Sequence, residues 1–359
     1  MLSLYLDFLQ YSIDSASFET EHFSSMDWQG LYNFARKHSL QGVLFAGVEK
    51  ISKKINIPRD MLLRWLGDSV SIKQRNRILN QEAVTLTKQL EKDGFHCCIL
   101  KGQGVAMLYP DPYVRTGGDI DVWMIPKDGK NARKSILDYL EQEGQKAGLC
   151  YLHATLPSKN NVAVEYHFYP SFSYSPCINK KLQNYFNSHT QFNRVTLPDD
   201  VGEISVPSLE FNLVFMLHHV YRHLFAEGIG LRQIIDYYYL LMQEKTNPAY
   251  MEKTLKELGL LKFAHAFMWV MKEVCALPEE RMLVSPDAVE GQFVLGEILQ
   301  SGNFGHTDVR FGINANTRWG RMQRKVRRNF HLMSRYPSEA FWQLPFLVWE
   351  TLAIKLAHR

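Results

Sequence analysis

Four short runs of β-favouring residues between Phe95 and Phe168 constrain the fold most, because the rest of the chain has helical patterns. Gly, Pro, Asn and Lys bound these runs, as is typical of strands. They read FHCCIL (95–100), DIDVWMI (119–125), LCYLHATL (149–156) and NVAVEYHF (161–168), and EISVPS (203–208) adds a further candidate. A helix is predicted for ARKSILDYLEQEG (132–144). This order predicts a mixed sheet flanked by helices.

Helical patterns fill both sides of these runs. The N-terminal part ends in a long stretch that begins at Pro58 and stops at Gly94, which predicts one long helix or a helix pair. Helices are also predicted from Ser208 onward, where Leu209, Leu213, Met216 and Val220 form one stripe, in LRQIIDYYYLLMQ and within 249–276; a loop is predicted at 300–317. We therefore predict an α+β fold with an N-terminal helical region (1–93), an α/β core (94–207) and a C-terminal helical region with a basic tail (208–359).

Composition limits the classes of protein to consider. The 359 residues are 46% hydrophobic, and the net charge is only +4, so nucleic acid is a partner that is neither required nor excluded. The five cysteines form no CxxC pair, and we find neither a signal peptide nor an apolar stretch of about 18 residues. These features predict a soluble, cytoplasmic protein without a transmembrane segment.

Two aspartates begin the second run, in the sequence RTGGDIDVW. Side chains alternate along a strand, so Asp119 and Asp121 point the same way, with Cα atoms roughly 6.5–7 Å apart. Two carboxylates this close repel each other unless a cation lies between them, and Mg²⁺ prefers such oxygen ligands. The alternative is a turn with solvated aspartates, but the apolar run that follows the pair makes this interpretation weaker.

Glu165 is a third candidate ligand. In VAVEYHF it shares one strand face with Ala163 and His167, while the apolar residues share the other. If this strand pairs beside the DID strand, three carboxylates converge on one face of the sheet. Such a cluster holds one or two metal ions for in-line phosphoryl or nucleotidyl transfer.

Three further residues are candidates for nucleotide binding. Lys101 and Gly102 form a turn between a predicted strand and a short helix, where backbone N–H groups and an ammonium group can approach a phosphate. A plain turn is the alternative. Arg115 lies four residues before Asp119, and its guanidinium suits an anion; a solvent-facing loop arginine is an equally good interpretation.

These motifs together resemble a known family. LKG, LYPDPYVRTGGDIDVWM, VEYH and HHVYRHLFAEGIGLRQIIDYYYLL, over roughly residues 60–245, resemble the uncharacterised nucleotidyltransferase family of bacteria, a branch of the DNA polymerase β-like superfamily. The resemblance implies that Asp119 and Asp121 are the metal-binding pair and Glu165 the third catalytic acid. It also implies Mg²⁺ or Mn²⁺ as cofactor and an NTP, such as ATP, as substrate. Lys101-Gly102 stands where the superfamily usually has Gly-Ser, which is a departure.

Two remaining features have competing interpretations. His219 and His223 have the i, i+4 spacing of zinc ligands, and His218 adjoins them, but we favour a helix face that packs on the core. The tail carries six basic residues, Arg318, Arg321, Arg324, Lys325, Arg327 and Arg328, before an aromatic stretch. A solvated helix face is the simplest interpretation; a peripheral contact with RNA, an acidic partner or a membrane surface is the alternative.

We therefore predict an enzyme, a metal-dependent nucleotidyltransferase that transfers an NMP from an NTP to an acceptor hydroxyl or similar group and releases pyrophosphate. The alternative is an inactive protein of the same fold that binds a partner through its basic C-terminal helix. A phosphotransferase or nuclease that uses the same acids is a second alternative. Neither the acceptor nor the base preference follows from the sequence.

Overall fold

The computed structural model describes residues 1–142, 147–157, 160, 162–305, 308, 310–311 and 317–357, without the side chains of 318, 319, 321 and 351–357. By its internal contacts the chain forms two compact units, which we describe separately. The first comprises Met1–Arg77, Leu108–Gly117 and Glu227–Asp308, and the second comprises Ile78–Met107, Gly118–Ala226 and Val309–Arg359. The α+β class is confirmed, whereas the division into three regions stays a prediction.

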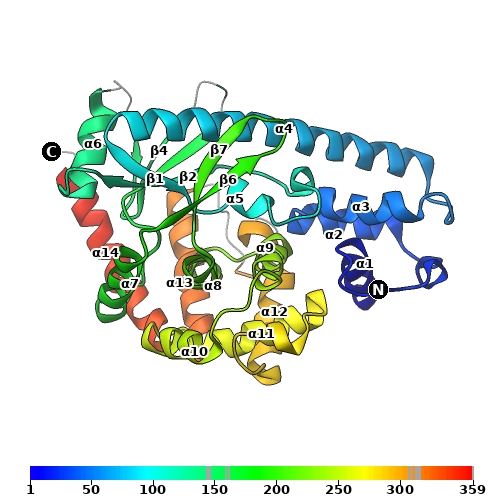
Figure 1. Cartoon of the computed structure of the whole chain (residues 1–359). Coiled ribbons are helices and arrows are strands. Elements are labelled where there is room, and N and C mark those ends of the chain that lie inside the picture. Colours follow the sequence, from blue (N-terminus) through cyan, green and yellow to red (C-terminus); the bar gives the residue numbers. More distant parts are fainter. Residues whose placement is uncertain are drawn as a thin grey trace. The chain divides into compact units, whose positions relative to one another are not determined.

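The first unit consists of helices (Figure 1). Its N-terminal elements are α1 (Leu2–Ser12), η1 (Thr20–Phe23), α2 (Trp28–His38), α3 (Gln41–Ile51) and the first half of α4 (Arg59–Lys92). Its later elements are η2 (Pro112–Val114), α9 (Leu231–Leu241), α10 (Pro248–Glu257), α11 (Leu261–Cys275), η3 (Glu279–Arg281), α12 (Ala288–Ser301) and η4 (Asn303–Gly305). The stretch from Pro58 to Gly94 is thus one continuous helix, the first of the two predicted forms.

The second unit contains the sheet. Its strands are β1 (Phe95–Ile99), β2 (Ile120–Pro126), β3 (Gly148–Leu149), β4 (His153–Pro157) and β5 (Ala163–His167), in the order β1-β2-β5-β4-β3. Only the β2–β5 pair is parallel, so the sheet is mixed, as predicted. A separate hairpin joins β6 (Phe192–Leu197) and β7 (Gly202–Pro207). Its helices are α5 (Gln103–Ala106), α6 (Ala132–Gln142), α7 (Pro176–Ser188), α8 (Leu209–Ala226), α13 (Arg318–Met333) and α14 (Pro337–Ala357).

The two faces of the sheet have different chemistry because side chains alternate along each strand. Ile120, Val122 and Met124 of β2 lie in a hydrophobic core with residues of α4 and α6. On the opposite face Trp123 stacks on Phe211 of α8, with ring centroids 5.6 Å apart. Asp121 belongs to this second face. The apolar core therefore fixes which face of the sheet carries the polar side chains.

Several predicted elements differ from the observed ones. The run Leu149–Leu156 is two strands, because the chain reverses between them and Cys150 N–H donates to the carbonyl of His153 (3.1 Å). The region 249–276 holds two helices, since Gly259, with a φ of +69°, ends the first. Helices α7 and α12 and strand β6 were not predicted. Much of the predicted loop, residues 306–307, 309 and 312–316, lies outside the described residues.

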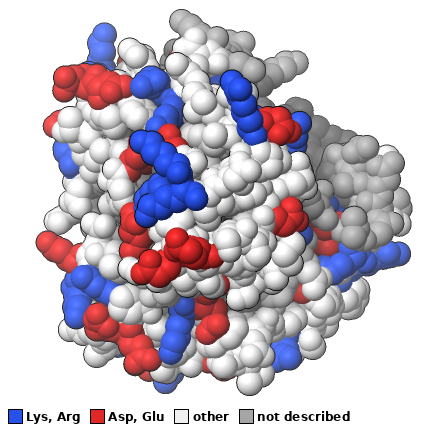
Figure 2. Space-filling model, turned by 90° about the vertical axis from the view of Figure 1, so that its right-hand side faces the viewer, with Lys and Arg blue, Asp and Glu red and all other residues white. Residues whose placement is uncertain are grey.

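None of the helices that the structure describes has the length and apolarity needed to span a bilayer. The face drawn in Figure 2 carries basic and acidic side chains interspersed with uncharged ones.

Candidate active site

The three predicted carboxylates meet at one place on the sheet. Asp121 of β2 and Glu165 of β5 are directly opposite each other in the parallel pair, and Asp119 immediately precedes β2. One carboxylate oxygen from each of the three lies within 4.8 Å of those of the other two. Strand pairing thus brings together residues 44 to 46 positions apart in the sequence, as the alternation argument required.

Asp121 is the most buried member of this carboxylate cluster, with 2% of its surface exposed. Its Oδ1 accepts from Lys101 Nζ at 3.0 Å and lies 3.1 Å from His167 Nε2. Its Oδ2 is also buried and has no hydrogen-bond partner among the described residues. A buried carboxylate oxygen without a partner is costly, and a bound cation removes that cost. The three hard oxygen donors therefore fit a divalent cation such as Mg²⁺.

Lys101 follows β1 and is held beside β2, where Leu100 N–H donates to the carbonyl of Asp121 (3.0 Å). Burial opposes the charge on Lys101, but the carboxylates of Asp121, Asp119 and Glu165 outweigh this effect and raise the pKa of its ammonium group. The amine is therefore a permanent cation at the edge of the carboxylate cluster.

Gly102 directly precedes the short helix α5, with a φ of +65° and a ψ of −111°, a conformation that favours glycine. A Cβ at this position would lie 3.8 Å from the carbonyl oxygen of Asp119, so backbone geometry rather than space requires the glycine. The predicted turn between a strand and a short helix is thus present.

Two histidines adjoin the carboxylates and were not among the predicted site residues. His167 lies on β5 two residues after Glu165, and His153 is its partner on β4. His153 Nδ1 is 2.7 Å from Glu165 Oε2, and His167 Nε2 is 3.3 Å from the same oxygen. Strand alternation places His167 on the face of Glu165, but His153 depends on a register that the sequence does not reveal.

The histidines control the charge of Glu165. Burial by itself would raise the pKa of Glu165, but hydrogen bonds with His153 and His167 lower it, so the carboxyl group is ionised. Conversely, burial disfavours the charged form of His167, while Asp121 and Glu165 raise the pKa of its ring. An ionised Glu165 suits a ligand for a cation better than a proton acceptor, because a carboxylate with a lowered pKa is a weak base.

Arg115 lies in the first unit and forms a buried ion pair there. Its Nε and Nη2 donate to the two carboxylate oxygens of Asp236 at 2.7 and 2.8 Å, and Tyr109 Oη donates to the same carboxylate at 2.7 Å. Only 4% of Arg115 is exposed, so the solvent-facing interpretation is wrong. A nucleotide contact by Arg115 stays a prediction.

His218 and His219 of α8 are buried inside the second unit. His218 Nδ1 contacts Ser171 Oγ at 2.8 Å, and burial lowers the pKa of His218 to about 3. His219 is also buried, and its ring is 4.4 Å from that of His223. Among the described residues, the groups that could hold a metal include none of these three. The preferred interpretation, a helix face packed in the core, agrees with this burial.

The basic stretch forms α13, and its charges have different surroundings. Arg328 is 1% exposed, and its Nε donates to the carbonyl of Leu224 at 2.7 Å, so it is part of the fold. Arg327 is exposed, and the side chains of Arg318 and Arg321 lie outside the described residues. A peripheral contact through this helix stays a prediction.

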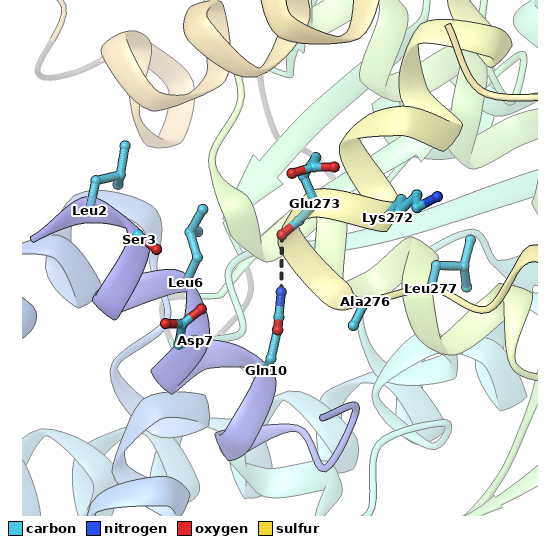
Figure 3. Close-up of a pocket in the computed structure, with 9 residues that line it drawn as sticks. All are labelled: Leu2, Ser3, Leu6, Asp7, Gln10, Lys272, Glu273, Ala276 and Leu277. Carbon is cyan, nitrogen blue, oxygen red and sulfur yellow. Dashed lines mark hydrogen bonds between the residues drawn. The ribbon is translucent and has the colours of Figure 1, made fainter. Parts of the chain in front are cut away.

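A pocket lies in the first unit, between α1 and the end of α11 (Figure 3). Gln10 crosses it and donates to the carbonyl of Glu273 (3.0 Å). The lining residues are Leu2, Ser3, Leu6, Asp7, Gln10, Lys272, Glu273, Ala276 and Leu277. None belongs to the carboxylate cluster, so this pocket contributes nothing to the site on the sheet.

Comparison with known proteins shows the family to which the chain belongs. The model of a family described as "Uncharacterised nucleotidyltransferase" matches residues 24–276, which include the whole carboxylate cluster. The chain belongs to this family. No curated protein matches it. A solved structure, described as an antigenic nucleotidyltransferase-like protein from Paracoccidioides brasiliensis, is similar with a TM-score of 0.36 and 13% identity, and the match covers 62% of this chain and 96% of that one.

Membership in this nucleotidyltransferase family agrees with the resemblance noted from the sequence. It indicates an enzyme of nucleotidyl transfer, and the fold and the acidic cluster are of the kind such enzymes need. The departure at Lys101-Gly102 now has a structural description, since the lysine pairs with Asp121 rather than standing apart from the acids.

Proposed function

We propose that the protein is a metal-dependent nucleotidyltransferase that transfers an NMP from an NTP, such as ATP, to an acceptor hydroxyl or similar group. The observation that carries the proposal is the convergence of Asp119, Asp121 and Glu165 within 4.8 Å on one sheet face, with Asp121 Oδ2 buried and unpartnered among the described residues. Mg²⁺ or Mn²⁺ is the cofactor that such oxygen donors suit.

Each residue has a distinct role in this proposal. Asp119, Asp121 and Glu165 hold the metal, which supplies charge neutralisation at the phosphates when it is bound. Lys101, already at the edge of the cluster, directs its ammonium group at a phosphate, and Gly102 lets the backbone of α5 begin close to Asp119. The acceptor oxygen bonds to the α-phosphorus, the bond to pyrophosphate breaks, and the acceptor proton passes to water. We assign Glu165 to metal binding because its pKa is lowered.

The inactive binding protein is not favoured. That alternative is supported if Glu165 points into a core or to a remote surface, whereas it lies with both aspartates. Placement in the DNA polymerase β-like superfamily, a bacterial origin and a cytoplasmic location stay predictions.

The test uses NTPs that are labelled at the α-phosphate, with a mixture of metabolites as acceptors. The measurement is where the label goes. We expect Mg²⁺-dependent pyrophosphate release and label on an acceptor. Asp119→Asn and Asp121→Asn should each lower the rate by about 10²–10³-fold, as for loss of one group that stabilises transition-state charge. Asp128→Asn, at an exposed residue just after β2, is the matched control and should keep the rate. Label that stays in the NDP, with no release of pyrophosphate, would mean that the γ-phosphate is transferred, which would indicate a phosphotransferase and contradict the proposal.

A further inference from the structure

Beside the carboxylates, β4 and β5 bring two imidazoles together. His153 and His167 face each other across the strand pair, with Nδ1 of the first 3.4 Å from Nε2 of the second. Both nitrogens also approach Glu165 Oε2, at 2.7 and 3.3 Å. Three potential ligand atoms thus form a small triangle.

The triangle has dimensions that suit a transition-metal ion. Ligand atoms about 2.0–2.1 Å from a tetrahedral Zn²⁺ lie about 3.3–3.4 Å apart. Two sides of the triangle, 3.3 and 3.4 Å, have this length, and the third, 2.7 Å, is that of a hydrogen bond. Two imidazoles and one carboxylate are a ligand set that Zn²⁺ and related ions accept, whereas Mg²⁺ prefers oxygen alone.

The hydrogen bonding of His167 supports the same interpretation. Its Nδ1 lies 3.1 Å from the carbonyl oxygen of Tyr169, which can only accept, so Nδ1 carries a proton. In the neutral ring the lone pair is then on Nε2, the atom that faces Glu165 and Asp121. Metal-bound histidines are usually oriented in this way, with the other ring nitrogen donating to a backbone carbonyl.

The same ring also contacts a carboxylate of the first cluster. Asp121 is 2% exposed, and its Oδ1 lies 3.1 Å from His167 Nε2. Within the described parts of the chain its Oδ2 has no hydrogen-bond partner. His167 is therefore in contact with both candidate ligand groups.

We propose that His153, Glu165 and His167 form a second metal site, selective for a borderline transition-metal ion such as Zn²⁺, beside the site of Asp119, Asp121 and Glu165. Glu165 belongs to both groups of candidate ligands. The site follows from its own geometry and goes beyond the proposed function, because it does not depend on which reaction the carboxylates support.

The test is a titration of Zn²⁺ into the metal-free, full-length protein without nucleotide, followed by calorimetry. His153→Gln and His167→Gln should each lower the affinity at least about tenfold, as even outer-shell substitutions commonly do. His96→Gln, at an exposed histidine of β1, is the matched control and should leave the affinity unchanged.

Co²⁺ provides a readout of the ligand type. With the wild type and with His96→Gln, we expect the visible absorption of an ion with nitrogen ligands, and its loss in His153→Gln. Circular dichroism checks that the variants fold. His167 is buried, and if His167→Gln does not fold, the result for His153→Gln, at a half-buried position, tests the proposal by itself. Zn²⁺ affinity that both folded histidine variants retain, or a Co²⁺ spectrum that His153→Gln leaves unchanged, would overturn the proposal. Neither readout involves nucleotidyl transfer, so failure here is distinguishable from failure of the proposed function.

Discussion

At the scale of single residues, Lys101 stabilises the carboxylate cluster of the candidate site. Its ammonium group is the cation nearest to a buried carboxylate that also has an unpartnered oxygen. Without a metal, this lysine offsets the repulsion among Asp119, Asp121 and Glu165, which is why its pKa is raised against the effect of burial.

Replacing Lys101 by methionine should therefore make folding depend on metal. Removal of one partner from a buried ion pair costs about 3–5 kcal/mol, and His167, which also contacts Asp121, reduces this cost. We expect Lys101→Met to lower the free energy of unfolding in EDTA and to show a larger rise of Tm with Mg²⁺ than the wild type. Denaturation curves with and without Mg²⁺ measure both effects, and an equal Mg²⁺ response in the two proteins would be evidence against this role.

Arg115 forms a buried ion pair that stabilises the fold of the first unit. Asp236 is buried with its carboxylate engaged by Arg115 and Tyr109. Arg115→Met removes the cation that is hydrogen-bonded to this carboxylate, and we expect a loss of about 3–5 kcal/mol in the free energy of unfolding, measured with urea. Tyr109→Phe removes one charge-assisted hydrogen bond and should cost less, about 1.5–3 kcal/mol. A milder effect of Arg115→Met than of Tyr109→Phe would contradict this interpretation.

At the scale of elements, the turn into α5 depends on Gly102. An L-residue rarely adopts a φ of +65° with a ψ of −111°, and such strain costs about 1–3 kcal/mol. We expect Gly102→Ala to lower Tm and to weaken nucleotide binding. Gly118→Ala is the control, because no atom lies within 4 Å of the position of its Cβ and its φ is not positive. Equal Tm values for the two variants would rule out the strain argument.

Elements also show how much the sequence can predict. The strands around Asp121 and Glu165 were predicted from short apolar runs, and alternation placed both acids on the polar face, because that pattern is local. The convergence of the three carboxylates was predicted only on the condition that β2 and β5 are neighbours. Strand pairing and register depend on contacts between distant segments, which the sequence does not reveal. His153 was missed for this reason: its strand was predicted as part of a longer run, and its partner His167 is fixed only by the β4–β5 register.

At the scale of the whole molecule, buried histidines predict how stability varies with pH. Each unit contains a buried histidine whose pKa burial lowers to about 3, His38 in the first and His218 in the second. Below the unfolded value of 6.5 the unfolded chain takes up a proton that the folded chain does not. Stability is therefore fully present above pH 6.5 and should fall between pH 6.5 and about 3, by up to about 1.4 kcal/mol per pH unit for each histidine.

Urea denaturation at several pH values measures the slope of the free energy of unfolding against pH. His218→Asn should make it shallower, whatever the effect of the substitution on stability at pH 7. His96→Asn, at an exposed position of β1, is the matched control. A slope that does not change in His218→Asn would show that this histidine is not responsible.

The central claim, that the carboxylate cluster binds a metal for an NTP, concerns the molecule as an enzyme. Its most direct test is calorimetric titration of the full-length protein with non-hydrolysable NTP analogues, with and without Mg²⁺. We expect nucleotide binding that requires Mg²⁺ in the wild type and in Asp128→Asn, and that is lost when Asp119→Asn and Asp121→Asn are combined. Nucleotide binding that is equal with and without Mg²⁺, or that survives the double substitution, would contradict the claim.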